Sequence, residues 1–230
     1  LVARGFLNLS QRDGRERPIP LAPGHRYCAT VQMTATAYAF PPGHRVRLAL
    51  STACWPIVWP SPDPVTITVF TGASRLELPV RRPQPGDARV APLPEPEASA
   101  ASQMSVLRPG RLERSLMIDQ VSGEVTHRLF IDGGTFGPWG KLRLEATGIE
   151  MTHVYDRTYR IRPDDPNSAQ AVMTQSCEMG RGDWQVKIET YAQMTSTRAT
   201  FELDAWVEAR EGDSLVCRRE WKSSVPRTDV

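Results

Sequence analysis

Two serines of this sequence lie in contexts that partly match the nucleophile of a serine hydrolase. Such a nucleophile needs a Gly-x-Ser-x-Gly turn between a strand and a helix, because the serine must stand clear of the sheet beside backbone N–H donors. Ser74 follows Gly72-Ala73 and Ser214 follows Gly212-Asp213, but neither serine is followed by the second glycine or by a helical pattern. The sequence therefore predicts turns at both places and assigns no catalytic residue.

Histidines and carboxylates offer no clear metal chemistry either. None of the four histidines has the spacing of His-Glu-x-x-His or of a zinc finger, so all four are predicted to be structural. Asp164-Asp165-Pro166-Asn167 gathers oxygens but lacks the spaced ligands and the bidentate Glu of a calcium loop. An Asx turn ahead of a strand explains this segment more simply. We predict no metal and no cofactor.

Aromatic chemistry is concentrated at Trp55-Pro56 and Trp59-Pro60. Together with Pro62 and Pro64, these prolines remove backbone donors and fix φ, which excludes a helix or a central strand and predicts a stiff, extended corner. The two indoles are expected to pack against a core or another domain, with each ring N–H bound to a partner. The alternative is a β-sandwich binding module in which Trp55 and Trp59 stack on a sugar ring.

Composition excludes several classes of partner. The 230 residues carry 28 Lys+Arg and 26 Asp+Glu with interleaved signs, so we expect neither a nucleic-acid surface nor an anionic-membrane surface. No apolar run approaches the roughly 20 residues of a membrane helix. The four cysteines show no Cys-x-x-Cys spacing, which favours free thiols in a reducing compartment and a cytoplasmic location, although a disulfide remains an alternative.

The elements that must position these residues are strands. Apolar and polar residues alternate with a period of two, which predicts strands. The segments are 1–10, 27–39, 45–50, 65–69, 76–80, 112–119, 125–131, 141–146, 151–161, 184–188, 201–207 and 215–217. A proline-rich connector is expected over 81–105, and the last three strands, joined by glycine-containing turns, predict an antiparallel meander. We predict an all-β fold, a jelly roll or β-sandwich with mostly antiparallel strands and few or no helices.

Ordered motifs in the first 80 residues resemble the C-terminal β domain of the cocaine-esterase-like (CocE/NonD) acyl hydrolases, relatives of X-Pro dipeptidyl-peptidase. The motifs are Val2–Ser10, Pro20-Leu21-x-Pro23-Gly24-x-x-Tyr27, Phe40-x-x-Gly43-His44-Arg45-Val46-Arg47-Leu48 and Ser51–Pro64. Longer members of the family also look similar to the ending Trp221-x-x-Ser224-Val225-Pro226-Arg227. The resemblance implies that a Ser-Asp-His triad lies in an upstream α/β-hydrolase domain, covered by a helical cap. No catalytic residue of that family falls on this chain.

This resemblance sets the expected organisation. We expect a jelly-roll part over 1–98, with its first strands missing, the end of the proline-rich connector over 99–111, and a second β-rich half over 112–230, which either continues the first domain or forms a separate one. The expected function is that of a noncatalytic C-terminal β domain that shapes or stabilises the catalytic domain or its oligomer. Expected partners are the upstream α/β-hydrolase and cap domains and, in a homo-oligomer, a second copy of the chain. Expected structural or interface residues are Trp55, Trp59, His44 and Arg45.

Overall fold

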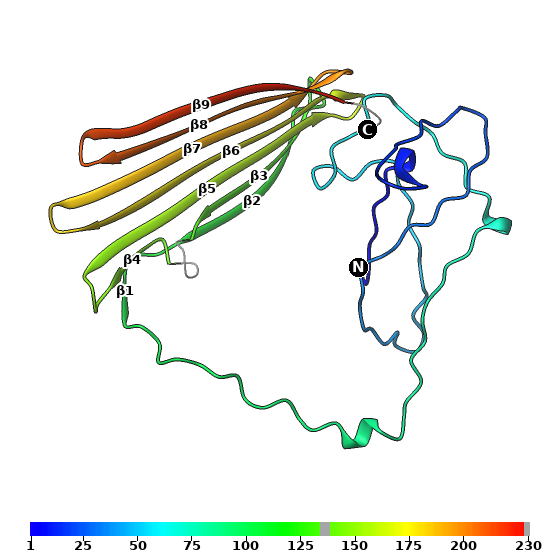
Figure 1. Ribbon diagram of the computed structural model, residues 1–230, viewed down its shortest axis with the longest axis horizontal. Coiled ribbons are helices and arrows are strands. Elements are labelled where there is room, and N and C mark those ends of the chain that lie inside the picture. The colour runs from blue at the N-terminus through cyan, green and yellow to red at the C-terminus, as the bar shows by residue number, and fades with distance from the viewer. Residues whose placement is uncertain (134–138, 228–230) are drawn as a thin grey trace.

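One large antiparallel β sheet dominates the computed structural model, which describes residues 1–133 and 139–227 (Figure 1). Its strands are β1 (Met104–Arg108), β2 (Arg111–Ile118), β3 (Val125–Asp132), β4 (Lys141–Leu144), β5 (Ile149–Arg162), β6 (Asp165–Arg181), β7 (Trp184–Ser196), β8 (Thr200–Glu211) and β9 (Ser214–Pro226). The helices among the described residues are three 3-10 turns, Leu9–Gln11, Thr71–Ala73 and Asp87–Arg89. The all-β class, with antiparallel strands and few helices, is confirmed.

The sheet is a meander from β5 to β9, to which the earlier strands add at one side. Neighbours follow the order β1-β4-β5-β6-β7-β8-β9, while β3 pairs with both β2 and β5. Residues 149–152 of β5 pair with β4 and residues 154–161 pair with β3, so β3 and β4 lie end to end along one side of β5. Gly182 and Gly212 have φ of 58° and 53°, the left-handed values that tight hairpin turns require. Both glycines lie in the predicted turns.

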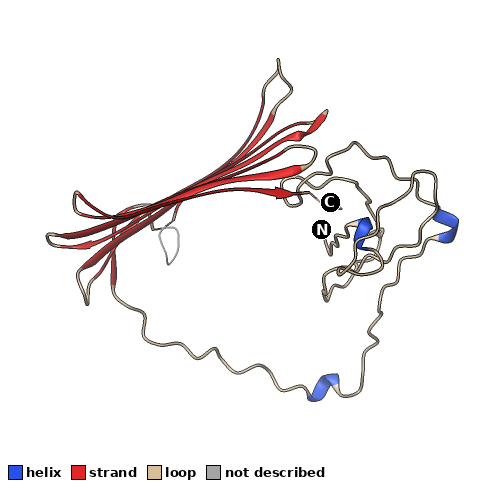
Figure 2. Ribbon diagram, turned by 45° about the horizontal axis from the view of Figure 1, so that its top comes forward, coloured by secondary structure: helices blue, strands red, loops and turns tan. Residues whose placement is uncertain are grey.

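The first 103 residues contain no strand, and the strands predicted between residues 1 and 80 are wrong. The structure leaves these segments as extended loops around short turns (Figure 2). An isolated backbone bond joins Thr34 N–H to Arg4 O at 2.9 Å, and side chains such as Val46 and Leu48 are more than half exposed. Alternation identifies the side chains of a strand that would be covered, but a strand also needs a hydrogen-bonded neighbour, and these segments have none.

Two further differences concern the second half of the chain. β1 lies inside 99–111, where the connector was expected to end, because Met104 and Val106 pair with Leu144 and Leu142 of β4. β6 was not predicted as a strand, yet at 17 residues it is the longest in the sheet and pairs along both sides. The proposed division into domains at 98 and 111 stays a prediction.

The register gives the sheet two chemically different faces. One face, here called the apolar face, carries Leu116, Tyr159, Met173, Ile188, Leu203 and Trp221. The opposite polar face carries cross-strand ion pairs such as Arg128–Asp156, Lys187–Glu178, Arg218–Glu208 and Lys222–Asp204. Leu142 and Ala169 are buried to 1% exposure, while Leu116 and Trp221 are 60% and 52% exposed. Much of the apolar face is therefore open to solvent.

Candidate contact site at the Trp-Pro corner

The Trp-Pro corner lies against one end of the sheet, where it contacts residues of β5, β7 and β8. The rings of Trp55 and Trp59 are 5.1 Å apart at an interplanar angle of 85°. Trp55 also meets Tyr159 of β5 edge-to-face at 6.1 Å, and Trp59 meets Phe201 of β8 edge-to-face at 6.0 Å. Edge-to-face pairs are the favoured geometry of aromatic side chains and add to the free energy gained by burial. The corner thus covers one end of the apolar face.

Hydrogen bonds tie the corner to the sheet as well. Trp59 Nε1 donates to Ser196 Oγ at 2.9 Å, and Asn167 Nδ2 donates to the Pro62 carbonyl at 3.0 Å. Because a proline has no N–H, only its carbonyl can bond. At Pro62 that carbonyl has a partner from β6.

Arg227 joins the corner to two parts of the sheet. Its Nη2 donates to the Pro60 carbonyl at 2.6 Å, and its Nη1 donates to the Thr197 carbonyl at 2.9 Å and to Asn167 Oδ1 at 3.3 Å. The guanidinium carbon lies 4.7 Å from the centre of the Phe201 ring. Arg227 is 7% exposed, and this burial lowers its pKa while the carboxylate of Asp63 acts in the opposite direction. An arginine nevertheless keeps its charge in proteins, so these bonds are charge-assisted.

Two buried nitrogens of this site have no hydrogen-bond partner among the described residues: Trp55 Nε1 and Arg227 Nε. An unpaired buried donor lowers the free energy of unfolding, because it loses its bond to water without a replacement. Trp59 therefore has the partner expected for an indole N–H, and Trp55 does not. The corner combines good ring packing with imperfect polar pairing.

His44 and Arg45 do not join this contact. Both are exposed, and His44 N–H closes a turn on Pro41 O at 3.2 Å. Within the described part of the chain, their side chains form no hydrogen bond, ion pair or ring contact with other residues. Their expected structural or interface role stays a prediction.

The serines and histidines considered for catalysis are not brought together in the described residues. Ser74 Oγ donates to the Phe70 carbonyl at 2.9 Å, and Ser214 begins β9 after the turn at Gly212. His153 Nε2 lies 3.4 Å from Gln175 Oε1, with its ring 4.2 Å from the ring of Tyr155. The described residues contain no group of three or more His, Cys, Asp or Glu side chains that could hold a metal ion. All four cysteines are free thiols.

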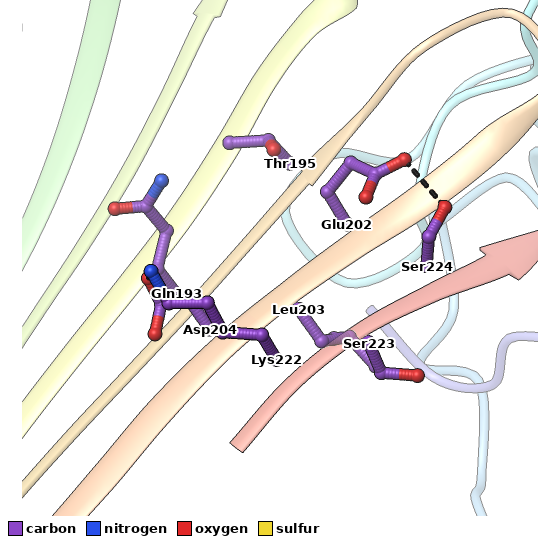
Figure 3. A pocket seen from close by; sticks show the side chains of 8 residues that line it. All are labelled: Gln193, Thr195, Glu202, Leu203, Asp204, Lys222, Ser223 and Ser224. Atoms are coloured by element: carbon purple, nitrogen blue, oxygen red, sulfur yellow. Dashed lines mark hydrogen bonds and ion pairs between the residues drawn. The ribbon is translucent and has the colours of Figure 1, made fainter. Parts of the chain in front are cut away.

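A polar hollow of about 430 Å³ lies where β7, β8 and β9 run side by side (Figure 3). Its lining residues are Gln193, Thr195, Glu202, Leu203, Asp204, Lys222, Ser223 and Ser224. Glu202 accepts hydrogen bonds from Thr200 Oγ1 at 2.6 Å and Ser224 Oγ at 2.8 Å, which lower the pKa of its carboxyl. A carboxylate whose pKa is lowered in this way is a weaker base than an unpaired one.

Sequence reasoning identified the corner but not the residues that contact it. Ser196 and Arg227 are separated from their corner partners by 137 and 167 residues, and the prolines do not indicate which strands they meet. The ending Trp221-x-x-Ser224-Val225-Pro226-Arg227 was the available signal for Arg227, because a proline followed by an arginine closes the last strand there.

The chain matches a known protein family, whereas no curated protein and no solved structure matches it. No helix in residues 1–133 or 139–227 has the length and apolar character needed to cross a membrane. The match covers the segment that carries the corner and ends before the sheet begins at Met104. Residues 1–95 match the family of the X-Pro dipeptidyl-peptidase C-terminal non-catalytic domain, which confirms the resemblance found in the sequence.

Proposed function

We propose that this chain is the noncatalytic C-terminal portion of a serine-dependent acyl hydrolase, either an esterase or an X-Pro-type dipeptidyl-peptidase. A non-catalytic C-terminal domain implies a linked catalytic domain in the same protein. In this proposal the chain shapes or stabilises that catalytic domain. We also propose a reducing, cytoplasmic location, because all four thiols are unpaired.

The observation that carries the proposal is the attachment of the family-matched segment to the sheet. Arg227 Nη2 bonds the Pro60 carbonyl, and Trp59 Nε1 bonds Ser196 Oγ. In our proposal these contacts make the matched segment and the sheet one body, which presents a fixed surface to the catalytic domain. In this proposal the chain acts through packing, since the serines and histidines considered for catalysis do not meet in the described residues.

The alternative of a sugar-binding platform has little support from the corner. A sugar ring stacks on an open, flat aromatic face, whereas Trp55 and Trp59 are perpendicular to one another and meet Tyr159 and Phe201. We therefore keep the packed corner as the basis of the proposed function.

The first test is an activity assay on the isolated chain. It should turn over neither p-nitrophenyl esters nor X-Pro amides. Turnover by the wild-type chain that Ser74→Ala abolishes would contradict the proposal.

The second test uses the whole parent enzyme. Arg227→Ala should lower the temperature at which activity is lost while leaving kcat/KM at low temperature close to that of the wild type. The matched control is Arg198→Ala, because Arg198 pairs with Asp63 beside the corner but its side chain is 76% exposed. An equal loss in both variants, or none in either, would count against a stabilising role for the corner.

A further inference from the structure

The strand β9 forms an open edge of the sheet. It pairs with β8 on one side, and its other side has no strand among the described residues. Twelve of its 13 residues are exposed, and Figure 1 shows it along the outer border of the sheet. An edge of this length presents a row of backbone N–H and C=O groups that can pair with another chain.

The pairing with β8 shows which residues of β9 direct their backbone groups outward. Arg227 N–H donates to Ala199 O at 2.8 Å, so these two residues form a hydrogen-bonded pair just beyond the strand end. In an antiparallel ladder such pairs alternate with non-hydrogen-bonded ones. The backbone N–H and C=O groups of odd-numbered residues such as Trp221 therefore bond β8. The backbone groups that point away from β8 belong to even-numbered residues. These are Arg218, Glu220, Lys222 and Ser224.

The charges along these outward residues are self-complementary in one antiparallel register. If two copies of β9 meet about a two-fold axis at Trp221, Glu220 of each copy lies opposite Lys222 of the other. Arg218 then faces Ser224, and residues 216–226 all find a partner residue. Opposite charges directly across a strand pair stabilise it, and like charges destabilise it.

Three neighbouring registers also allow the outward backbone groups of the two strands to bond each other, but each places like charges opposite one another. A shift that sets Glu220 opposite Glu220 also sets Arg218 opposite Lys222. A second shift sets Lys222 opposite Lys222. A third sets Arg219 opposite Arg219, although it also sets Arg218 opposite Glu220. Of these four registers, the one centred on Trp221 pairs opposite charges and places no like charges opposite each other, so the charges on this edge favour it.

Trp221 has the surroundings expected for the centre of such a contact. Its side chain is 52% exposed, and no aromatic ring in the described chain packs against it. In the pairing above, the two Trp221 residues form a non-hydrogen-bonded pair, in which Cα atoms lie about 4.5 Å apart and side chains are closest. Cross-strand aromatic pairs are among the favourable ones.

We propose that β9 pairs antiparallel with β9 of a second copy of this chain, with Trp221 facing Trp221 and each Glu220 facing Lys222 of the other copy. The two sheets then become one continuous sheet, and their apolar faces lie on the same side. The inference does not depend on the proposed enzyme family, because it uses only the edge strand and its charges.

The first experiment measures the dimer dissociation constant of the whole chain by sedimentation equilibrium. Glu220→Lys alone and Lys222→Glu alone each place like charges at both facing positions and should raise that constant at least about tenfold. An equimolar mixture of the two variants should form a heterodimer as tight as the wild-type dimer, because the facing charges are again opposite. Lys187→Glu, a charge reversal on β7 away from the edge, is the matched control and should leave the constant unchanged.

The second experiment tests the register without relying on charge. Under mild oxidation Trp221→Cys should give a disulfide-linked dimer, because this residue faces itself, whereas Ser223→Cys, which faces Arg219, should give no more than the wild type. Circular dichroism verifies that each variant folds. A monomer at all concentrations up to about 100 μM, a dimer insensitive to both charge reversals, or preferential cross-linking through residue 223 would each overturn the proposal.

Discussion

Arg227 and Pro60 are hydrogen-bonded at 2.6 Å although 167 residues separate them in the chain. The bond joins the residue that follows the last strand to the carbonyl of the Trp-Pro corner. It is one of several contacts that fix the extended N-terminal half to the end of the sheet. Arg227 therefore bonds both the corner and the sheet.

Removing the Arg227 side chain should destabilise the chain strongly. Arg227→Ala leaves the carbonyls of Pro60 and Thr197 without this donor, and charge-assisted bonds contribute about 1.5–3 kcal/mol each. We expect the free energy of unfolding to fall by about 3 kcal/mol, measured by urea denaturation with tryptophan fluorescence. Arg227→Lys should recover less than half of the loss, because an ammonium cannot reproduce the planar fork. Full recovery by lysine would show that charge alone matters.

The two indoles of the corner should respond differently to phenylalanine. Trp59→Phe removes the bond from Nε1 to Ser196, whereas Trp55→Phe removes a buried N–H that has no partner. We therefore expect Trp59→Phe to lower the free energy of unfolding by about 1 kcal/mol more than Trp55→Phe. The alanine variants of both should cost about 3 kcal/mol through lost ring packing. Thermal unfolding of the four variants checks this order, and equal effects of the two phenylalanines would contradict it.

The sequence predicted the sheet well where local patterns are sufficient. The hairpins that join β6 to β7 and β8 to β9 turn at glycines between alternating runs, and Gly182 and Gly212 lie there with positive φ. β6 was missed because its apolar residues, such as the adjacent Val172 and Met173, do not alternate cleanly with polar ones. The period of two identifies a strand whose two faces differ in polarity, and it misses a strand in which they do not.

The corner shows the other limit of sequence reasoning. Four prolines and two indoles predict a stiff segment with buried rings, because these are properties of the residues themselves. The partners Ser196, Phe201 and Arg227 are set by the path of the chain, which no local pattern specifies. The strands predicted around residues 27–69 failed for the same reason, since alternation does not supply a neighbouring strand.

Acid should weaken the sheet through the carboxylates of its polar face. Arg210 and Arg218 lower the pKa of Glu208, and Lys141 and Arg143 lower that of Glu150. A carboxyl whose pKa in the folded state is lower than its ordinary pKa of 4.5 contributes its full stabilisation of the fold above pH 4.5. That stabilisation is lost as the pH falls below 4.5 and through the pKa of the carboxyl in the folded state.

The urea midpoint should therefore change little between pH 7 and 5 and fall below pH 4.5. Glu208→Gln should flatten this decline, and because both carboxylates are near solvent, added salt should reduce the effect. Glu95→Gln is the control, since Glu95 lies in the connector without an ion pair among the described residues. A pH dependence that is identical in the wild type and in Glu208→Gln would refute the role of this carboxylate.

Two glycines near strand ends should differ in their tolerance of alanine. A Cβ at Gly140 would lie 2.5 Å from the Pro109 carbonyl oxygen, and its φ of +24° is unfavourable for an L side chain. A Cβ at Gly180 would lie 2.1 Å from Gln185 Oε1, but that atom is the end of a flexible side chain that can turn away. Gly140→Ala must instead move backbone beside β1, so it should lower the melting temperature by several degrees more than Gly180→Ala. Calorimetry of both variants measures the difference. The double variant Gly180→Ala/Gln185→Ala should then melt no lower than Gln185→Ala alone, because the three atoms nearest to the new methyl group, all from the Gln185 side chain, have been removed.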